Sequence, residues 1–182
     1  MTKNNWRPAA LSLTALGAIA RLLPHPPNFA PVGAMSLFSG ARLPRWQAYL
    51  VPLALMAVTD PILSPLYGYQ PFSKYLLFTY LSFLVSVWLG RRLLRNTESV
   101  SWIAAVTLLN SVQFFVITNF GSWLWFQAYP HTSAGLAACY IAAIPFFGWT
   151  LASDILYTGV LFGLHAWLSR TVATQERVAA VA

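Results

Sequence analysis

Long apolar runs, separated by short polar or proline-rich breaks, constrain this chain more than any other feature. Of its 182 residues, 58% are hydrophobic and only 8% are charged. A soluble domain needs a polar shell, which so few polar residues cannot build. We therefore predict an all-α integral membrane bundle that forms a single transmembrane domain over residues 1–182. The predicted spans are residues 9–23, 29–41, 46–63, 72–90, 100–118 and 146–168.

The net charge of +7 raises the alternative of nucleic-acid binding. A nucleic-acid binder gathers Lys and Arg on one accessible face. Here the basic residues flank the apolar runs instead, as they do where helices are anchored to an anionic cytoplasmic leaflet. They are Lys3, Arg7, Arg42, Arg45, Arg91, Arg92, Arg95, Arg170 and Arg177. We expect the lipid bilayer as a partner and no nucleic acid.

The number of spans depends on residues 29–41. Thirteen helical residues cover about 20 Å, which is short of the roughly 30 Å hydrocarbon core. If this segment crosses, six helices span the inner membrane and both termini are cytoplasmic. Snorkelling, tilt of the neighbouring helices or burial inside the bundle could then accommodate its short length. If it is re-entrant, five spans remain and the N-terminus lies outside. Lys3 and Arg7 directly flank the first helix and favour six spans.

In the six-span arrangement, the outer connections differ from the basic inner ones. They cover residues 24–29, 64–72 and 119–131, and they are rich in proline and aromatic residues. Stiff aromatic loops can stack on and hydrogen-bond a small molecule at little ordering cost. An aromatic belt at the membrane interface is the alternative explanation. The candidate substrate contacts in the third connection are Asn119, Trp123, Trp125, Tyr129 and His131.

Ionisable side chains within the apolar runs supply further candidates. Such groups cost about 3 kcal/mol at membrane depth, so each needs a partner or a use. Arg21 and Asp60 lie near outer helix ends, whereas Asp154 lies about a third of the way into the last helix. We place Arg21 and Asp154 at the floor of the candidate binding site. The alternative is that Arg21 pairs with Asp60 or Asp154 simply to lock the bundle.

Cys139, the single cysteine, excludes an intramolecular disulfide. It is a weak candidate ligand for a metal or for the cobalt of a corrinoid, and otherwise a small packing residue. The chain has no P-loop, H-E-x-x-H or G-x-S-x-G motif. We expect no enzyme activity and no resident cofactor.

The stretches 21–34, 118–123 and 135–147 resemble a family of small bacterial inner-membrane proteins of uncharacterised function. The size, six-span plan and outer loops are also similar to the S-components, the substrate-binding subunits of energy-coupling-factor vitamin transporters. That resemblance implies a vitamin or metal bound under the outer loops, and a coupling subunit with ATPases as partners. It also implies a small-residue face on helix one for that subunit. Here Ala10, Thr14 and Ala18 would form that face.

These observations together predict a membrane-embedded substrate-binding or uptake protein for a small micronutrient, such as a vitamin, a corrinoid or a metal. The alternative is a membrane scaffold or assembly factor that transports nothing.

Overall fold

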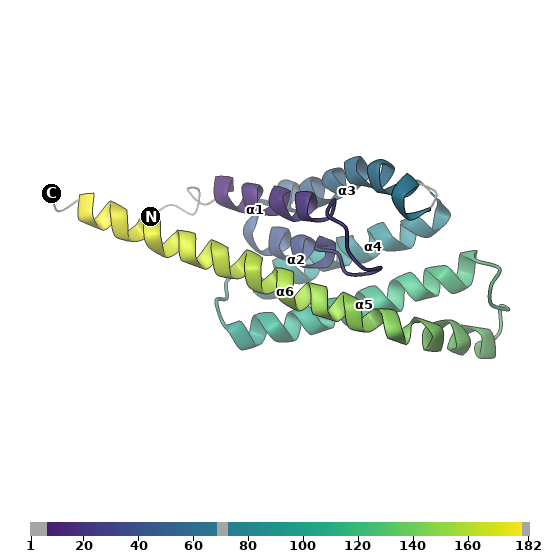
Figure 1. The fold of residues 1–182 in the computed structure, drawn as a ribbon. Coiled ribbons are helices and arrows are strands. Elements are labelled where there is room, and N and C mark those ends of the chain that lie inside the picture. The colour runs from purple at the N-terminus through teal and green to yellow at the C-terminus, as the bar shows by residue number, and fades with distance from the viewer. Residues whose placement is uncertain (1–6, 69–72, 180–182) are drawn as a thin grey trace.

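The described chain is built from six α-helices and one π-helical turn (Figure 1). The structure, a computed structural model, describes residues 7–68 and 73–179, and no strand occurs within them. The elements are α1 (Arg7–Ala20), α2 (Val32–Arg42), α3 (Arg45–Tyr67), α4 (Lys74–Leu89), η1 (Gly90–Leu94), α5 (Val100–Trp125) and α6 (Ser133–Ala179). Successive helices run in opposite directions, so α1 begins and α6 ends at the same end of the bundle (Figure 1). The all-helical prediction is confirmed.

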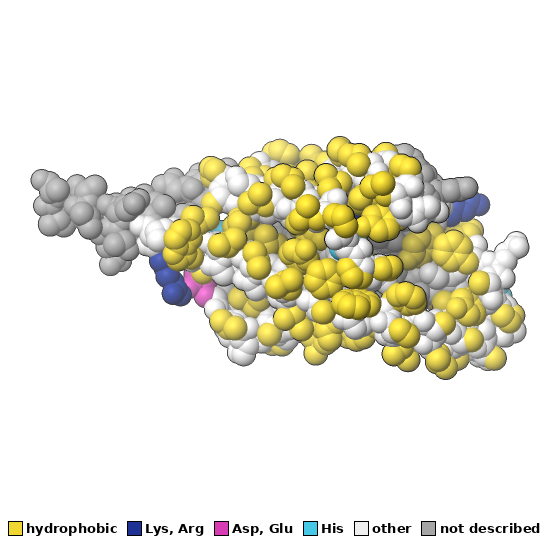
Figure 2. Space-filling model, viewed as in Figure 1, with side chains coloured by type: hydrophobic (Ala, Val, Ile, Leu, Met, Phe, Trp, Pro, Cys, Tyr) yellow, Lys and Arg dark blue, Asp and Glu magenta, His cyan; other side chains and the backbone are white. Residues whose placement is uncertain are grey.

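The surface and the interior have the polarity expected in a lipid solvent. Large apolar side chains are exposed, among them Val100 at 81% and Leu66 at 72%, while Asp60 and Asp154 are at most 2% exposed. Figure 2 shows hydrophobic side chains over most of the visible face and only a few charged ones near its two ends. Helices α3, α4 with η1, α5 and α6 are each long and apolar enough to cross a membrane. These are the properties of a membrane protein.

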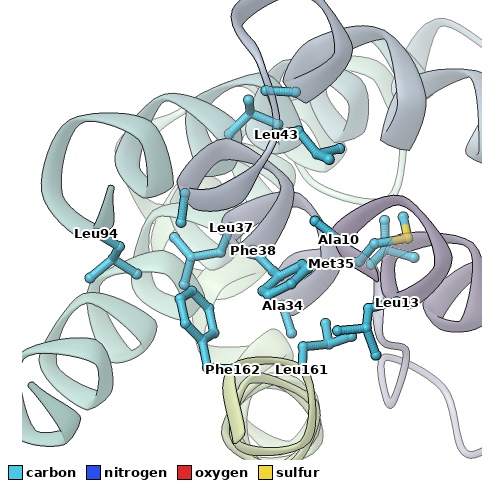
Figure 3. Close-up of a cluster of buried hydrophobic side chains, with 14 of the residues drawn as sticks. Ala10, Leu13, Ala34, Met35, Leu37, Phe38, Leu43, Leu94, Leu161 and Phe162 are labelled. Atoms are coloured by element: carbon cyan, nitrogen blue, oxygen red, sulfur yellow. The ribbon is translucent and has the colours of Figure 1, made fainter. Parts of the chain in front are cut away.

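The short helix α2 forms the centre of the bundle. Every residue from Pro31 to Ala41 is buried, and α2 contacts all five other α-helices and η1. Its 11 residues span only about 16 Å, and they are mostly glycine, alanine, serine and medium-sized apolar residues. Figure 3 shows Leu37 and Phe38 of α2 meeting Phe162 of α6, with the Phe38 and Phe162 rings edge to face at 5.2 Å. The structure therefore accommodates this short helix by burying it inside the bundle.

Two glycines allow α2 to lie directly against α4 and η1. A Cβ atom added at Gly40 would overlap the carbonyl oxygen of Val87, and one added at Gly90 would overlap that of Leu37. The two backbones are therefore in contact, as in other membrane helix pairs with small residues at the crossing. At the C-terminal end of α2, Arg42 donates hydrogen bonds to the carbonyl oxygens of Leu94 (3.0 Å) and Thr97 (3.1 Å). These bonds fix the end of α2 to the connection that follows η1.

Several helices extend beyond the ends predicted from sequence. The Asp60-Pro61 pair does not end α3, which continues through Pro61 and Pro65 to Tyr67. Proline is tolerated here because side chains satisfy carbonyl groups that it leaves free: the Ser64 hydroxyl donates to the Pro61 carbonyl oxygen at 3.1 Å. Likewise α6 runs as one helix from Ser133 through Pro145, so no separate helix begins near Phe146.

The prediction of a loop over residues 119–131 is wrong for its first half, because α5 continues to Trp125. Asn119 and Ser122 lie within this range. In the structure their side chains donate back to their own helix, to the carbonyl oxygens of Phe115 (2.8 Å) and Thr118 (3.1 Å).

The face of α1 expected to meet a partner subunit is used within the chain. Ala10, Thr14 and Ala18 are each at most 4% exposed, and α1 packs on α2, α3 and α6. These small residues allow neighbouring helices to approach α1 closely, but those helices belong to the same molecule. This face is therefore not available to a partner in this arrangement.

Candidate functional site

A cavity of about 350 Å³ lies at the end of the bundle where α1 meets α2 through the 21–31 connection. All six α-helices or the connections that adjoin them contribute to its wall. The lining residues are Arg21, His25, Pro27, Asn28, Ala30, Val32, Gly33, Leu63, Tyr67, Thr79, Phe83, Phe114, Thr150, Ser153 and Asp154. We call it the outer cavity. Its volume is at the lower end of the range of about 300–1,000 Å³ found for ligand sites.

An ion pair holds one side of the outer cavity. The Arg21 guanidinium, which directly follows α1, donates to Asp60 Oδ1 at 2.5 Å and to the Thr59 hydroxyl at 2.6 Å. The Tyr80 hydroxyl donates to the second oxygen of Asp60 at 2.8 Å. The Arg21 and Asp60 side chains are 14% and 2% exposed. Of the two partners predicted for Arg21, the structure selects Asp60, and the pair joins α1, α3 and α4.

Asp154 of α6 occupies the floor of the outer cavity and caps the start of α2. The N-cap position, Pro31, makes no side-chain hydrogen bond to the helix. Instead, the Asp154 carboxyl interacts with the Ala34 backbone N–H, and it accepts a hydrogen bond from the Ser111 hydroxyl at 2.7 Å and a longer one from the Asn110 amide at 3.4 Å. A carboxylate at this position satisfies an N–H group that has no partner within the helix and lies at the positive end of its dipole.

Gly33 makes this arrangement possible, because a Cβ atom there would overlap Asp154 Oδ1. Asp154 is thus a structural cap that also lines a cavity. Asp154 lies on the cavity wall, and its role as a substrate-binding residue stays a prediction. The capping role is one that the sequence alone did not indicate.

The proline-rich 21–31 connection forms the rim of the outer cavity. The His25 ring stacks on Tyr67 with centroids 5.6 Å apart, and its Nε2 lies 3.1 Å from the Arg21 carbonyl oxygen. Asn28 adopts φ = 64°, the left-handed conformation that Asn tolerates better than most residues. Pro26 and Pro27 limit the motion of the intervening backbone. The rim therefore presents an imidazole and an amide on a stiff loop, beside the phenol ring of Tyr67 at the end of α3.

A second hollow of about 570 Å³ adjoins the outer cavity and shares Arg21, Asn28, Thr79 and Phe114 with it. The Thr79 hydroxyl lies in this shared wall and has no hydrogen-bond partner among the described residues. Buried hydroxyl groups are nearly always paired, so an unpaired one beside a cavity is where a bound polar atom is expected. Thr79 and Asn28 were not predicted as site residues, since neither belongs to a recognisable motif.

The structure does not gather all the residues that the sequence proposed for the site. Arg21 and Asp154 line the outer cavity, and Asn119 lines a small hollow of about 70 Å³ that also reaches Asn28. None of the remaining four lines the outer cavity. They are Trp123, Trp125, Tyr129 and His131.

The tip of the α5–α6 hairpin uses three of these four side chains for its own packing. Trp123 packs edge to face on His131 at 5.2 Å and donates to the Pro130 carbonyl oxygen at 3.0 Å. The Trp125 ring lies 5.0 Å from the Lys74 ammonium group. Trp123, Trp125 and His131 thus have packing partners within the chain, and their role as substrate contacts stays a prediction.

Cys139 is buried in the contact between α6 and α5, with its Sγ 3.5 Å from the Asn119 carbonyl oxygen. Among the described residues, no group of three or more His, Cys, Asp or Glu side chains could hold a metal ion. The Cys139 thiol packs between the two helices, and its role as a ligand stays a prediction.

Fold and site together define a class: a helical membrane bundle with a hydrophobic core, several buried polar groups and a cavity at one end. Over residues 2–177 the chain matches a family of unknown function (DUF6580), and it belongs to that family. No curated protein and no solved structure matches the chain. The expected membership of an uncharacterised family is confirmed, while the resemblance to S-components gains no support from these comparisons.

Proposed function

We propose that this protein binds a small micronutrient in the outer cavity and serves in its capture or uptake across the membrane. The observation that carries the proposal is the outer cavity itself, to which five helices and the connection after α1 contribute. A wall made of aromatic rings with a few convergent polar groups is typical of small-molecule sites. Charged groups inside a membrane bundle also mark substrate pathways more often than chance, because their burial is costly.

The proposed orientation places the outer cavity on the non-cytoplasmic side of the inner membrane, with six spans and both termini in the cytoplasm. Six arginines lie at the end of the bundle opposite the outer cavity, which we call the basic end: Arg42, Arg45, Arg91, Arg92, Arg95 and Arg170. The cavity end has only Arg21 and Lys74 as basic residues in the described ranges. An excess of Lys and Arg in short loops marks the cytoplasmic side.

The size and chemistry of the outer cavity narrow the ligand. A space of about 350 Å³ suits a compact molecule such as a vitamin of one or two rings, and is small for a corrinoid. Phe83, Phe114 and Tyr67 offer ring faces, while Asn28 and Thr79 offer hydrogen-bonding atoms. We therefore favour a flat heteroaromatic ligand with a polar edge.

Ligand binding to the purified protein tests this proposal. The protein in detergent is heated with a panel of water-soluble vitamins, and each shift in the unfolding temperature is recorded. We expect at least one single- or double-ring compound to stabilise the protein, since a ligand at 100 times its Kd adds about 2.7 kcal/mol.

Two substitutions at Thr79 link such binding to the outer cavity. Thr79→Phe fills the shared wall and should abolish the shift, whereas Thr79→Val keeps the shape, removes the hydroxyl and should weaken binding about fivefold. Ile141→Phe, at an exposed position of α6, is the matched control. If no compound stabilises the protein, or if Thr79→Phe leaves the shift unchanged, the proposal fails and a scaffold without a ligand becomes the better hypothesis.

A further inference from the structure

A separate hollow lies at the basic end, between the first half of α5 and residues 155–170 of α6. Its volume is about 340 Å³, and it shares no residue with the outer cavity. Val100 and Ile103 of α5 and Gly159, Phe162 and Gly163 of α6 form much of its wall. We call it the α5–α6 groove.

Two glycines leave the groove open along α6. Gly159 and Gly163 are one turn apart, both are exposed, and a Cβ atom added at either would meet nothing within 4 Å. The adjacent Ile155 is 58% exposed. The floor of the groove is therefore an apolar surface that an extended hydrocarbon chain can contact closely.

A buried hydroxyl group in the same groove lacks a partner. Thr158 is 3% exposed, lines the groove, and its Oγ1 has no hydrogen bond among the described residues. Other buried threonines in this bundle donate back to the carbonyl oxygen four residues earlier, as Thr14 and Thr107 do at 2.8 Å. An unpaired hydroxyl in an apolar groove indicates that the occupant supplies a polar atom there.

Charged side chains surround the end of the groove nearest the basic end. Arg42, His165 and Arg170 contribute to the wall together with one acid, Glu98, which leaves a formal charge of +1 with His neutral. The Arg42 guanidinium lies 5.1 Å from the centre of the Phe162 ring, one turn beyond Thr158. This end of the groove therefore favours an anion over a cation.

We propose that the α5–α6 groove binds one anionic phospholipid, with an acyl chain along Gly159 and Gly163 and the phosphate beside Arg42 and Arg170. An ester carbonyl, which lies below the phosphate in such a lipid, would accept the Thr158 hydroxyl. Basic pockets between membrane helices on the cytoplasmic side are suited to acidic head groups. The single lipid would fill the space that α5 and α6 leave between them.

Lipid retention and thermal unfolding test this inference. The protein is placed in nanodiscs of phosphatidylcholine, with or without phosphatidylglycerol, and lipids that remain bound after detergent extraction are counted by native mass spectrometry. We expect one phosphatidylglycerol to be retained and to raise the unfolding temperature. Gly163→Leu should abolish retention, whereas Gly148→Leu should keep it. Gly148 is the matched control because it is also exposed on α6 and open to added atoms.

Three further variants test the polar contacts. Arg170→Gln should reduce retention of phosphatidylglycerol about fivefold, and Glu98→Gln should increase it by a similar factor, because each changes one charge beside the phosphate. Thr158→Val keeps the shape and should weaken retention several-fold. Equal retention of both lipids, or normal retention by Gly163→Leu, would overturn the inference. A change of oligomeric state in Gly163→Leu with unchanged lipid retention would also overturn it, since it would indicate a second copy on this surface.

Discussion

The contact between Gly33 of α2 and the Asp154 carboxyl of α6 makes a quantitative prediction. A methyl group at residue 33 would overlap Asp154 Oδ1, so Gly33→Ala must displace either the carboxyl or the start of α2. Displacement weakens the hydrogen bonds from the Ser111 hydroxyl, at 2.7 Å, and from the Asn110 amide, at 3.4 Å. In a variant that lacks the Asp154 carboxyl, we expect Gly33→Ala not to destabilise the protein.

The size of the effect follows from those bonds. Two hydrogen bonds to a buried charged group contribute about 1.5–3 kcal/mol each, and partial loss of both gives about 3 kcal/mol. The higher helix propensity of alanine offsets up to about 1 kcal/mol of this, so Gly33→Ala should destabilise by about 2 kcal/mol. Asp154→Ala should destabilise by about 3–5 kcal/mol, because it leaves the Ser111, Asn110 and Ala34 donors without an acceptor. In the Asp154→Ala background, Gly33→Ala should be neutral or stabilising by up to about 1 kcal/mol.

Reversible unfolding by SDS in mixed micelles measures all four members of this double-mutant cycle. We expect a coupling of about 2–3 kcal/mol between the two substitutions, which is the upper part of the range for residues in contact. Gly148→Ala is the control for helix propensity, since nothing lies within 4 Å of its added methyl group. A coupling below about 0.5 kcal/mol would show that the carboxyl does not cap α2, and would refute the reasoning.

Three other predictions concern different parts of the bundle. Gly40→Ala should destabilise by about 3 kcal/mol in the same SDS titration, because the added methyl group meets the Val87 carbonyl on a rigid backbone. Asp60→Ala should destabilise the protein by about 3 kcal/mol, since it leaves the largely buried Arg21 guanidinium without its carboxylate. Tyr80→Phe removes only one hydrogen bond to Asp60 and should cost about 1 kcal/mol, so equal effects of the two variants would argue against the ion pair. In a Cys139→Ala background, Gln127→Cys should react with a membrane-impermeant maleimide in intact cells and Asn96→Cys should not. The reverse pattern would invert the proposed orientation.

Long apolar runs made the all-helical class and the helical segments accessible from sequence, because a chain with so few charged residues cannot build the polar surface of a soluble protein. Helix ends were harder to predict. Pro61 and Pro65 normally end a helix in water, yet α3 passes through both, helped by the Ser64 hydroxyl at the Pro61 carbonyl. Asn119 and Ser122 satisfy their own helix in the same way. A polar side chain can end a helix or stabilise it, depending on its tertiary environment, which the local sequence does not specify.

The candidate site was only partly accessible from sequence for a related reason. Arg21 and Asp154 stood out because charge is rare in an apolar run, and both line the outer cavity. Asn28 and Thr79 are ordinary residues that become significant only where four segments converge on them. The aromatic side chains near Trp123 were conspicuous, but a residue count does not distinguish a ligand contact from packing at a hairpin tip.

The capping of α2 by Asp154 has a consequence for the order in which the protein is made. The second helix leaves the ribosome more than a hundred residues before the aspartate that completes its first turn. Until then its start has no side-chain cap, and its glycine-rich surface has few neighbours. We expect truncated chains that end before residue 154 to be recognised by membrane quality control, and the native arrangement to form only after the final segment has entered the bilayer.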